Sequence, residues 1–93
     1  MSCACPEYLA RTYRDVRDAV YAHADEQRIR PHLAPAGLPV AGVVLGAFTC
    51  RVCGTGWVEA DYSSGHMRII YLFPVPAEEL AARCAAGEGL PRP

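Results

Sequence analysis

The sequence predicts an α+β domain in which a long N-terminal helix and a short C-terminal helix pack on a three-stranded antiparallel sheet. Three observations predict this fold. An amphipathic stretch follows Pro6, valine-rich and alternating segments fill the middle of the chain, and four cysteines form two closely spaced pairs. Because a chain of 93 residues has room for one core, we expect a single domain over residues 1–93.

The long helix is predicted over residues 7–30. Pro6 suits the first turn of a helix, and Pro31 ends the pattern. Between them, apolar side chains recur at helical spacing, at Leu9, Tyr13, Val16 and Val20. Two ion pairs at i,i+4 spacing are expected on the solvated face, Arg11 with Asp15 and Arg14 with Asp18.

A proline-rich connector is predicted over residues 31–39, where neither a helix nor a central strand fits. Residues 40–49 then form a mostly buried, valine-rich strand. A bend is expected at Gly42 or Gly46, because glycine in a strand often marks one.

A β-hairpin is the best-supported tertiary contact in the sequence. From Trp57 onward, alternate residues face opposite sides, and the stretch "SSGH" forms the turn. A turn closed over Ser64 and Gly65 gives a register in which the first face is apolar and the second carries an opposite-charge pair. The expected partners are Tyr62 with Met67, Ala60 with Ile69, Val58 with Tyr71, Asp61 with Arg68, Glu59 with Ile70 and Trp57 with Leu72.

The short C-terminal helix is predicted over residues 77–87. Two glutamates lie in its first turn, Arg83 in its last, and Gly87 ends it. Residues 87–93 are expected to form a flexible tail.

Charge and hydropathy disfavour several classes of protein. The net charge is −1, so nucleic acid is an unfavoured partner. We find neither a signal peptide nor an apolar run long enough to cross a bilayer, so we expect a cytoplasmic protein without membrane contact. In a reducing compartment, closely spaced cysteines more often bind metal than form disulfides.

The stretch "CRVCG" carries the strongest functional signal. Cys50 and Cys53 are separated by two residues, Gly54 permits a tight turn, and predicted strands flank the motif. Such a loop can direct both sulfurs at one point. These residues resemble one half of a zinc ribbon or a rubredoxin-like knuckle, which implies a second cysteine pair on the same metal ion. Here the other pair is Cys3 and Cys5, separated by one alanine at the start of a helix.

We therefore predict a structural zinc site whose ligands are Cys3, Cys5, Cys50 and Cys53. The alternatives are a site in which a histidine or Cys84 replaces one ligand, a thiol-disulfide pair, and cysteines without any ligand; iron also suits four thiolates. Cys84 shares a helix face with Leu80 and reads as a small buried apolar residue. The histidines that stay open as substitutes are His23, His32 and His66.

Four cysteines leave no open coordination position, and we find no nucleophile and base at a recognisable spacing, so an enzyme is not expected. The predicted function is a non-enzymatic role through a protein partner, as in a regulator, an accessory protein or an immunity-type protein. The alternatives are a nucleic-acid-binding zinc ribbon and a thiol-redox or metal-transfer protein.

The metal should hold the long helix across the apolar face of the hairpin and couple metal binding to folding. The opposite face, around Trp57, Ile70 and Leu72, is either covered by the C-terminal helix or open to a partner.

Overall fold

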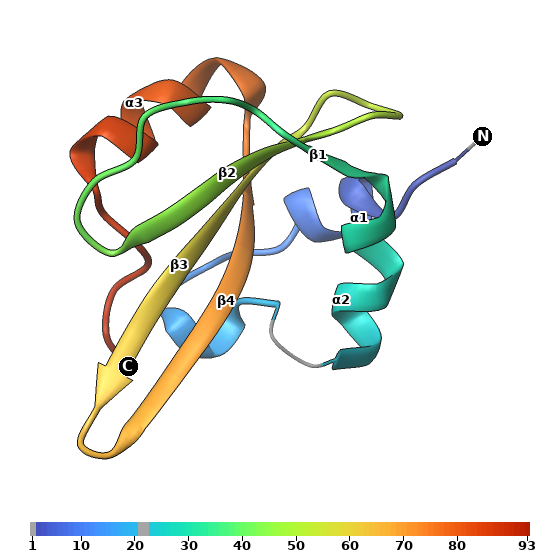
Figure 1. The fold of residues 1–93 in the computed structure, drawn as a ribbon. Helices are drawn as coiled ribbons and strands as arrows, with labels where there is room; N and C mark the ends of the chain where they lie inside the picture. Colours follow the sequence, from blue (N-terminus) through green and yellow to red (C-terminus); the bar gives the residue numbers. More distant parts are fainter. Residues whose placement is uncertain (1, 21–22) are drawn as a thin grey trace.

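The sheet has four antiparallel strands instead of the predicted three. The computed structural model describes residues 2–20 and 23–93, and within them the strands follow the order β1-β2-β3-β4 across the sheet (Figure 1). Their bounds are Leu33–Pro35 for β1, Val44–Cys50 for β2, Gly56–Ser64 for β3 and Met67–Val75 for β4. The three-stranded prediction missed β1, an edge strand inside the proline-rich connector. Such a position tolerates proline, because Pro35 needs no N–H partner at an edge.

The predicted long helix is wrong. Its described residues instead form α1 (Cys5–Leu9), a 3-10 turn η1 (Val16–Asp18), α2 (His23–Ile29) and a second 3-10 turn η2 (Arg30–His32). Val16 and Val20, which the helical spacing placed on one stripe, lie in two different apolar clusters. Val20 also exchanges two backbone hydrogen bonds with Leu72, of 2.9 and 3.0 Å, at the outer edge of β4.

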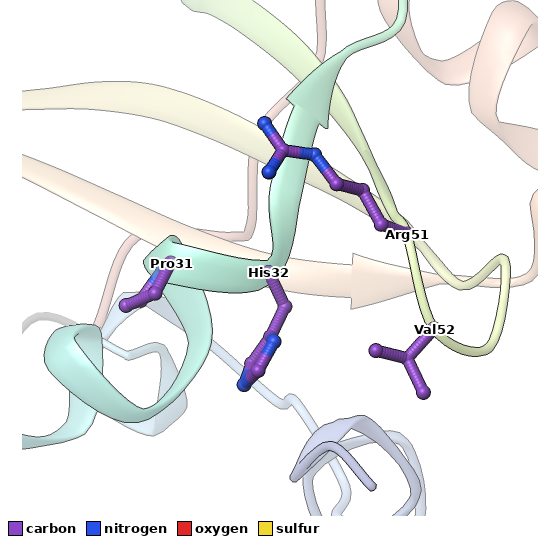
Figure 2. Close-up of a pocket in the computed structure, with 4 residues that line it drawn as sticks. All are labelled: Pro31, His32, Arg51 and Val52. Atoms are coloured by element: carbon purple, nitrogen blue, oxygen red, sulfur yellow. The ribbon is translucent and has the colours of Figure 1, made fainter. Parts of the chain in front are cut away.

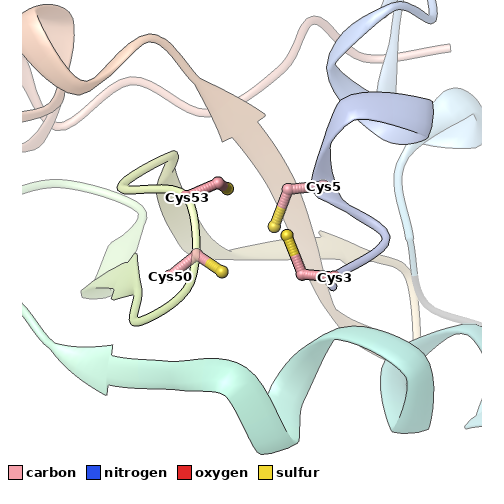
Figure 3. A group of neighbouring side chains, drawn as sticks. All are labelled: Cys3, Cys5, Cys50 and Cys53. Atoms are coloured by element: carbon pink, nitrogen blue, oxygen red, sulfur yellow. The ribbon is translucent and has the colours of Figure 1, made fainter. Parts of the chain in front are cut away.

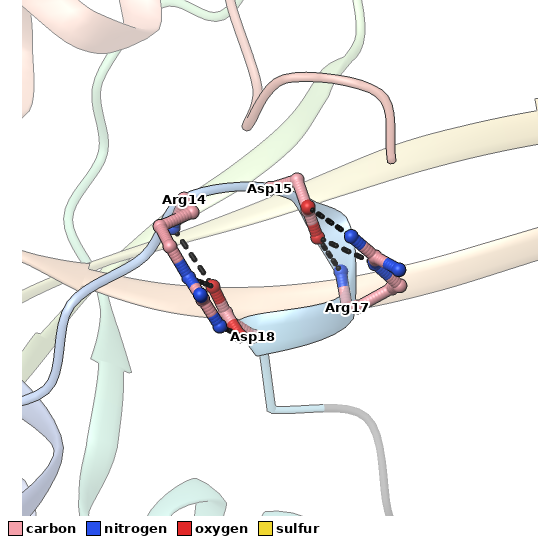
Figure 4. A network of polar contacts seen from close by, with 4 residues as sticks. All are labelled: Arg14, Asp15, Arg17 and Asp18. Atoms are coloured by element: carbon pink, nitrogen blue, oxygen red, sulfur yellow. Dashed lines mark hydrogen bonds and ion pairs between the residues drawn. The ribbon is translucent and has the colours of Figure 1, made fainter.

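Aspartate side chains hold the non-helical backbone around η1 (Figure 4). The Asp15 carboxylate accepts a hydrogen bond of 2.9 Å from the Arg17 backbone N–H, and Asp18 accepts one of 2.9 Å from Arg14. Such side-chain acceptors offer the backbone an alternative to the helical ladder. Of the two predicted ion pairs, Arg14 with Asp18 forms, whereas Asp15 pairs with Arg17 and Arg11 pairs with Glu7.

The β3–β4 hairpin forms in a register shifted by two residues from the predicted one. Ser64 lies opposite Met67, Tyr62 opposite Ile69 and Val58 opposite Phe73. The connection is a two-residue turn that begins at Gly65, whose φ of 58° suits the first position of a type II′ turn. A shift of two residues keeps each side chain on its predicted face, because the period of a strand is two.

The strand predicted over residues 40–49 begins later, at Val44, and ends at Cys50. Its pairing with β3 shifts between Val44 and Gly46, so the irregularity lies beside one of the two glycines at which a bend was predicted.

Two apolar clusters cover the two faces of the sheet. The α3-side cluster lies under α3 (Leu80–Ala86), which follows the 3-10 turn η3 (Ala77–Glu79), and the N-terminal cluster lies under α1 and α2 on the other face (Figure 1). The buried members of the α3-side cluster are Val16, Val44, Ala47, Val58, Ala60, Tyr71, Phe73, Val75, Leu80 and Cys84. Those of the N-terminal cluster are Cys5, Tyr8, Val20, Ile29, Leu33, Cys50, Trp57 and Leu72.

This arrangement settles which face the N-terminal residues cover. They bury Trp57 and Leu72, both 0% exposed, whereas the C-terminal helix covers the face of Val58 and Tyr71. The prediction that the N-terminal helix lies across the face of Val58 is therefore wrong, and the C-terminal helix does not cover Trp57. Ile70, the third large residue of the Trp57 face, stays 42% exposed.

The C-terminal residues contact the end of the sheet that lies away from the cysteines. Gly87 ends α3 with a φ of 70°, and the Leu90 backbone N–H donates to the Tyr71 hydroxyl at 2.9 Å. The Arg92 guanidinium donates to the Ser63 carbonyl at 2.7 Å. Whether residues 87–93 are flexible in solution stays a prediction. No described helix combines the length and apolar character that a membrane span requires.

Candidate metal centre

The four cysteines of the two pairs meet at one end of the sheet. Their sulfur atoms all lie within 4.8 Å of one another, although the pairs are more than 40 residues apart in the chain. Figure 3 shows the side chains pointing at a common centre, with one pair from the N-terminal segment and the other from the end of β2 and the loop that follows it. The structure therefore brings together the complete ligand set predicted from sequence, which is Cys3, Cys5, Cys50 and Cys53.

The loop between β2 and β3 is a tight knuckle. The Cys50 backbone N–H donates to the Thr55 carbonyl at 2.9 Å, and the Gly54 N–H donates to the Cys50 carbonyl at 3.0 Å. Gly54 has a φ of 80°, a left-handed conformation that glycine adopts without steric cost. The flanking strands thus fix both ends of the loop, and its two sulfurs face the same centre.

The N-terminal pair is positioned by the burial of α1 against β3 and β4. Cys5 is 1% exposed and Tyr8 is 0% exposed, and the Tyr8 ring meets Trp57 edge-on at a centroid distance of 6.0 Å. The indole N–H of Trp57 donates to the Cys5 sulfur at 3.3 Å. Arg28 joins α2 to this segment, because its guanidinium donates to the Glu7 carboxylate at 2.7 Å and to the Tyr8 hydroxyl at 3.1 Å.

The four thiols experience different electrostatic surroundings. Burial raises the pKa of Cys5 far above its ordinary value. A hydrogen bond from the Cys5 backbone lowers the pKa of Cys3, but burial and the thiols of Cys53 and Cys50 outweigh it, so the net shift is upward. Burial also acts against ionisation of Cys53, yet hydrogen bonds from the Thr55 side chain and backbone hold its pKa at about 7. The site therefore contains both a readily ionised sulfur and sulfurs that need a cation to stabilise their thiolate form.

The geometry fits a soft, four-coordinate metal ion. Zinc–thiolate bonds of about 2.3 Å in a tetrahedron place neighbouring sulfurs about 3.8 Å apart, so adjustments of about an ångström or less would close the shell. All five cysteines of the chain are free thiols, so no disulfide competes for these sulfurs. Thiolate ligands favour zinc or iron over calcium or magnesium, which prefer oxygen.

The other ligands considered from sequence lie elsewhere. Cys84 is 0% exposed in the α3-side cluster, where burial raises its pKa. His66 is exposed in the β3–β4 turn, and His32 is half-buried at the end of η2. The side chain of His23 lies outside the described residues. Within the described part of the chain, the group that could hold a metal contains the four cysteines and no histidine.

A cavity of about 660 Å³ lies beside the knuckle and is lined by Pro31, His32, Arg51 and Val52. The side chains of Arg51 and His32 do not converge in this cavity. In Figure 2, the Arg51 guanidinium extends along β1, while the His32 imidazole points toward the opposite side. Their backbones are joined by a hydrogen bond of 2.8 Å from the Arg51 N–H to the His32 carbonyl.

Sequence reasoning missed the place of Trp57 beside the cysteines. The sequence predicts that its face is either covered by the C-terminal helix or open to a partner, whereas the N-terminal segment buries it. One sequence signal could have found it, because Trp57 is the first bulky residue after the knuckle. Since β3 pairs antiparallel with β2, this position lies close to the cysteines. No protein-family model, curated protein or solved structure matches the chain. The case for a metal centre therefore rests on the geometry of these residues.

Proposed function

We propose that the chain is a small non-enzymatic protein whose fold is held by a structural zinc ion and which acts by binding another protein. The observation that carries this proposal is the convergence of four thiol sulfurs from two distant segments within 4.8 Å. Four thiolates complete the tetrahedral shell of zinc, so no position remains for a water or a substrate. The ion would join the N-terminal segment to the β2–β3 knuckle and thereby stabilise the N-terminal cluster.

Zinc is preferred to iron because a structural role requires no change of oxidation state. The two are easily distinguished, because an iron–thiolate site is coloured and redox-active, whereas zinc has a filled d shell and is neither. Elemental analysis and the visible spectrum of protein purified from its natural source would identify the ion. One colourless zinc per chain is expected, and a stoichiometric coloured iron site would contradict the zinc assignment.

A protein partner is favoured over nucleic acid by how the arginines are used. Within the described part of the chain, six of the nine arginines form ion pairs with carboxylates, namely Arg11, Arg14, Arg17, Arg28, Arg30 and Arg68. Such pairs reduce the positive charge available to phosphates. Ile70 and Leu45, at 42% and 40% exposed, add apolar area of the kind that protein interfaces use.

The test of this function is purification of the chain from its natural source at native abundance, with and without a zinc chelator. We expect a protein to co-purify in fixed stoichiometry and to be lost when the metal is removed. A co-purified nucleic acid whose binding weakens steeply with salt would replace this proposal with a nucleic-acid-binding function. Turnover of a substrate by the metal-loaded chain would refute the non-enzymatic role.

A further inference from the structure

The four sulfurs of the candidate metal centre differ in their access to solvent. Cys53 is exposed and Cys3 is half-buried, whereas Cys5 and Cys50 are only 1% and 2% exposed. Cys53 lies on the outer side of the knuckle, next to Thr55, whose hydroxyl is 3.1 Å from its sulfur. A small oxidant arriving from solvent therefore meets this sulfur before the other three.

We propose that Cys53 is an oxidation site for hydrogen peroxide, and that its oxidation leads to a Cys50–Cys53 disulfide that releases the metal and frees the N-terminal segment. The inference rests on the proposed metal site and adds a regulation of that site. It assigns different roles to the two cysteine pairs. The knuckle pair is oxidised, and the N-terminal pair loses the metal ion that joins it to the knuckle.

The knuckle geometry selects Cys50 as the thiol that resolves the oxidised Cys53. Both residues belong to one loop, whose ends are held by the backbone hydrogen bonds of Cys50 with Thr55 and Gly54. Their sulfurs lie within 4.8 Å, so rotation about the side-chain bonds and a small loop adjustment can form an S–S bond of about 2.05 Å. Cys5 is less available, because its sulfur is buried and accepts the Trp57 N–H.

The chemistry balances with peroxide as the oxidant. The Cys53 thiolate attacks one peroxide oxygen, an S–O bond forms, the O–O bond breaks, and hydroxide leaves, which gives a sulfenic acid. The Cys50 thiolate then attacks the Cys53 sulfur, an S–S bond forms, the S–O bond of the sulfenic acid breaks, and the second hydroxide leaves. Two electrons pass from the two sulfurs to the peroxide, and the metal departs because two of its four thiolates have been consumed.

The consequence for the fold follows from which segments the disulfide joins. A Cys50–Cys53 bond lies within the knuckle and places no constraint on the N-terminal segment. Residues 2–9 would then be held to the sheet by packing around Tyr8, while Arg28 ties Glu7 to α2. Opening of this segment exposes Trp57, which is 0% exposed in the intact structure. A bond between Cys3 and either knuckle cysteine would instead keep the segment attached.

The test is peroxide treatment of the full-length, zinc-loaded protein, followed over time by a chromogenic zinc indicator, tryptophan emission, and alkylation with peptide mapping. We expect one zinc ion released for each Cys50–Cys53 disulfide, with a red shift of Trp57 emission at the same rate and reversal by a dithiol with added zinc. Cys84, buried at 0% exposure away from the site, is the internal control and should stay reduced throughout.

Three results would overturn the inference. The first is retention of zinc while peroxide oxidises other residues. The second is a disulfide that joins Cys3 or Cys5 to the knuckle. The third is oxidation of Cys84 as fast as Cys53, which would indicate general unfolding. Failure of the proposed function looks different, because a chain that binds no zinc before peroxide is added would refute the metal site itself.

Discussion

At the scale of single residues, Trp57 links the candidate metal centre to the apolar core. Its ring packs against Tyr8, and its N–H reaches the Cys5 sulfur at 3.3 Å. Hydrogen bonds to a metal-ligating atom orient that atom and stabilise its charged form, so the indole would support a metal ion bound by Cys5.

Trp57→Phe should therefore lower zinc affinity about tenfold or more, because the donor to Cys5 is lost while an aromatic ring remains. Affinity is measured by competition with a chelator of known strength. Tyr8→Phe is the control, since it alters the same cluster but removes only a hydroxyl that pairs with Arg28. Equal affinities for wild type and Trp57→Phe would show that the indole N–H contributes nothing to metal binding.

Tyr13 supplies a prediction about alkaline stability. Burial raises its pKa to about 12, and its hydroxyl donates to the Tyr8 carbonyl at 2.8 Å. An unfolded tyrosine titrates near pH 10, so the folded state disfavours the tyrosinate form of Tyr13. The contribution of Tyr13 to the free energy of unfolding is therefore complete below about pH 10 and is lost as the pH rises toward 12. Over that pH interval, the denaturant concentration at the unfolding midpoint should decrease less with pH in Tyr13→Phe than in the wild type. An unchanged pH profile would place Tyr13 in solvent.

At the scale of elements, the N-terminal half shows where sequence periodicity is insufficient. The spacing of Val16 and Val20 fits a helix, yet the chain passes the outer edge of β4 and places them in clusters on opposite faces of the sheet. A single helix could cover only one face, so burial on both faces outweighed the weak helical preference. No local pattern encodes that choice.

The hairpin was easier to predict because alternation fixes the face of each side chain. Its register was not fixed, since shifts by two residues preserve the faces and only the turn at Gly65 decides among them. The knuckle was the most predictable part, because the cysteine spacing, Gly54 and the flanking strands all favour one loop. That the N-terminal pair reaches it depends on the tertiary fold.

Gly87 tests the packing of α3 against the loop before β2. Gly87 and Gly37 both have a φ of 70°, but a side chain at residue 87 would lie 2.7 Å from the Ala41 carbonyl carbon, whereas residue 37 has open space. Gly37→Ala should cost about 1 kcal/mol from backbone strain, and Gly87→Ala should cost clearly more. Urea denaturation measures both, and equal losses would contradict the close contact.

At the scale of the whole molecule, we expect metal binding to be coupled to folding. The N-terminal cluster combines residues from both cysteine-bearing segments, so removing the ion should weaken that cluster more than the α3-side cluster. We expect chelation to increase amide exchange in α1 and the knuckle first, with Tyr71 and Phe73 in β4 protected longest. Uniform loss of protection would show instead that the two clusters unfold together.

The most direct test of the central claim is native mass spectrometry of the zinc-loaded chain beside its Cys3→Ser, Cys5→Ser, Cys50→Ser, Cys53→Ser and Cys84→Ser variants. The joint site predicts one zinc ion per wild-type chain, full retention in Cys84→Ser, and loss or marked weakening in each of the other four, including the two N-terminal variants. Wild-type affinity in Cys3→Ser and Cys5→Ser would contradict the account, because the metal would then bind without the N-terminal pair.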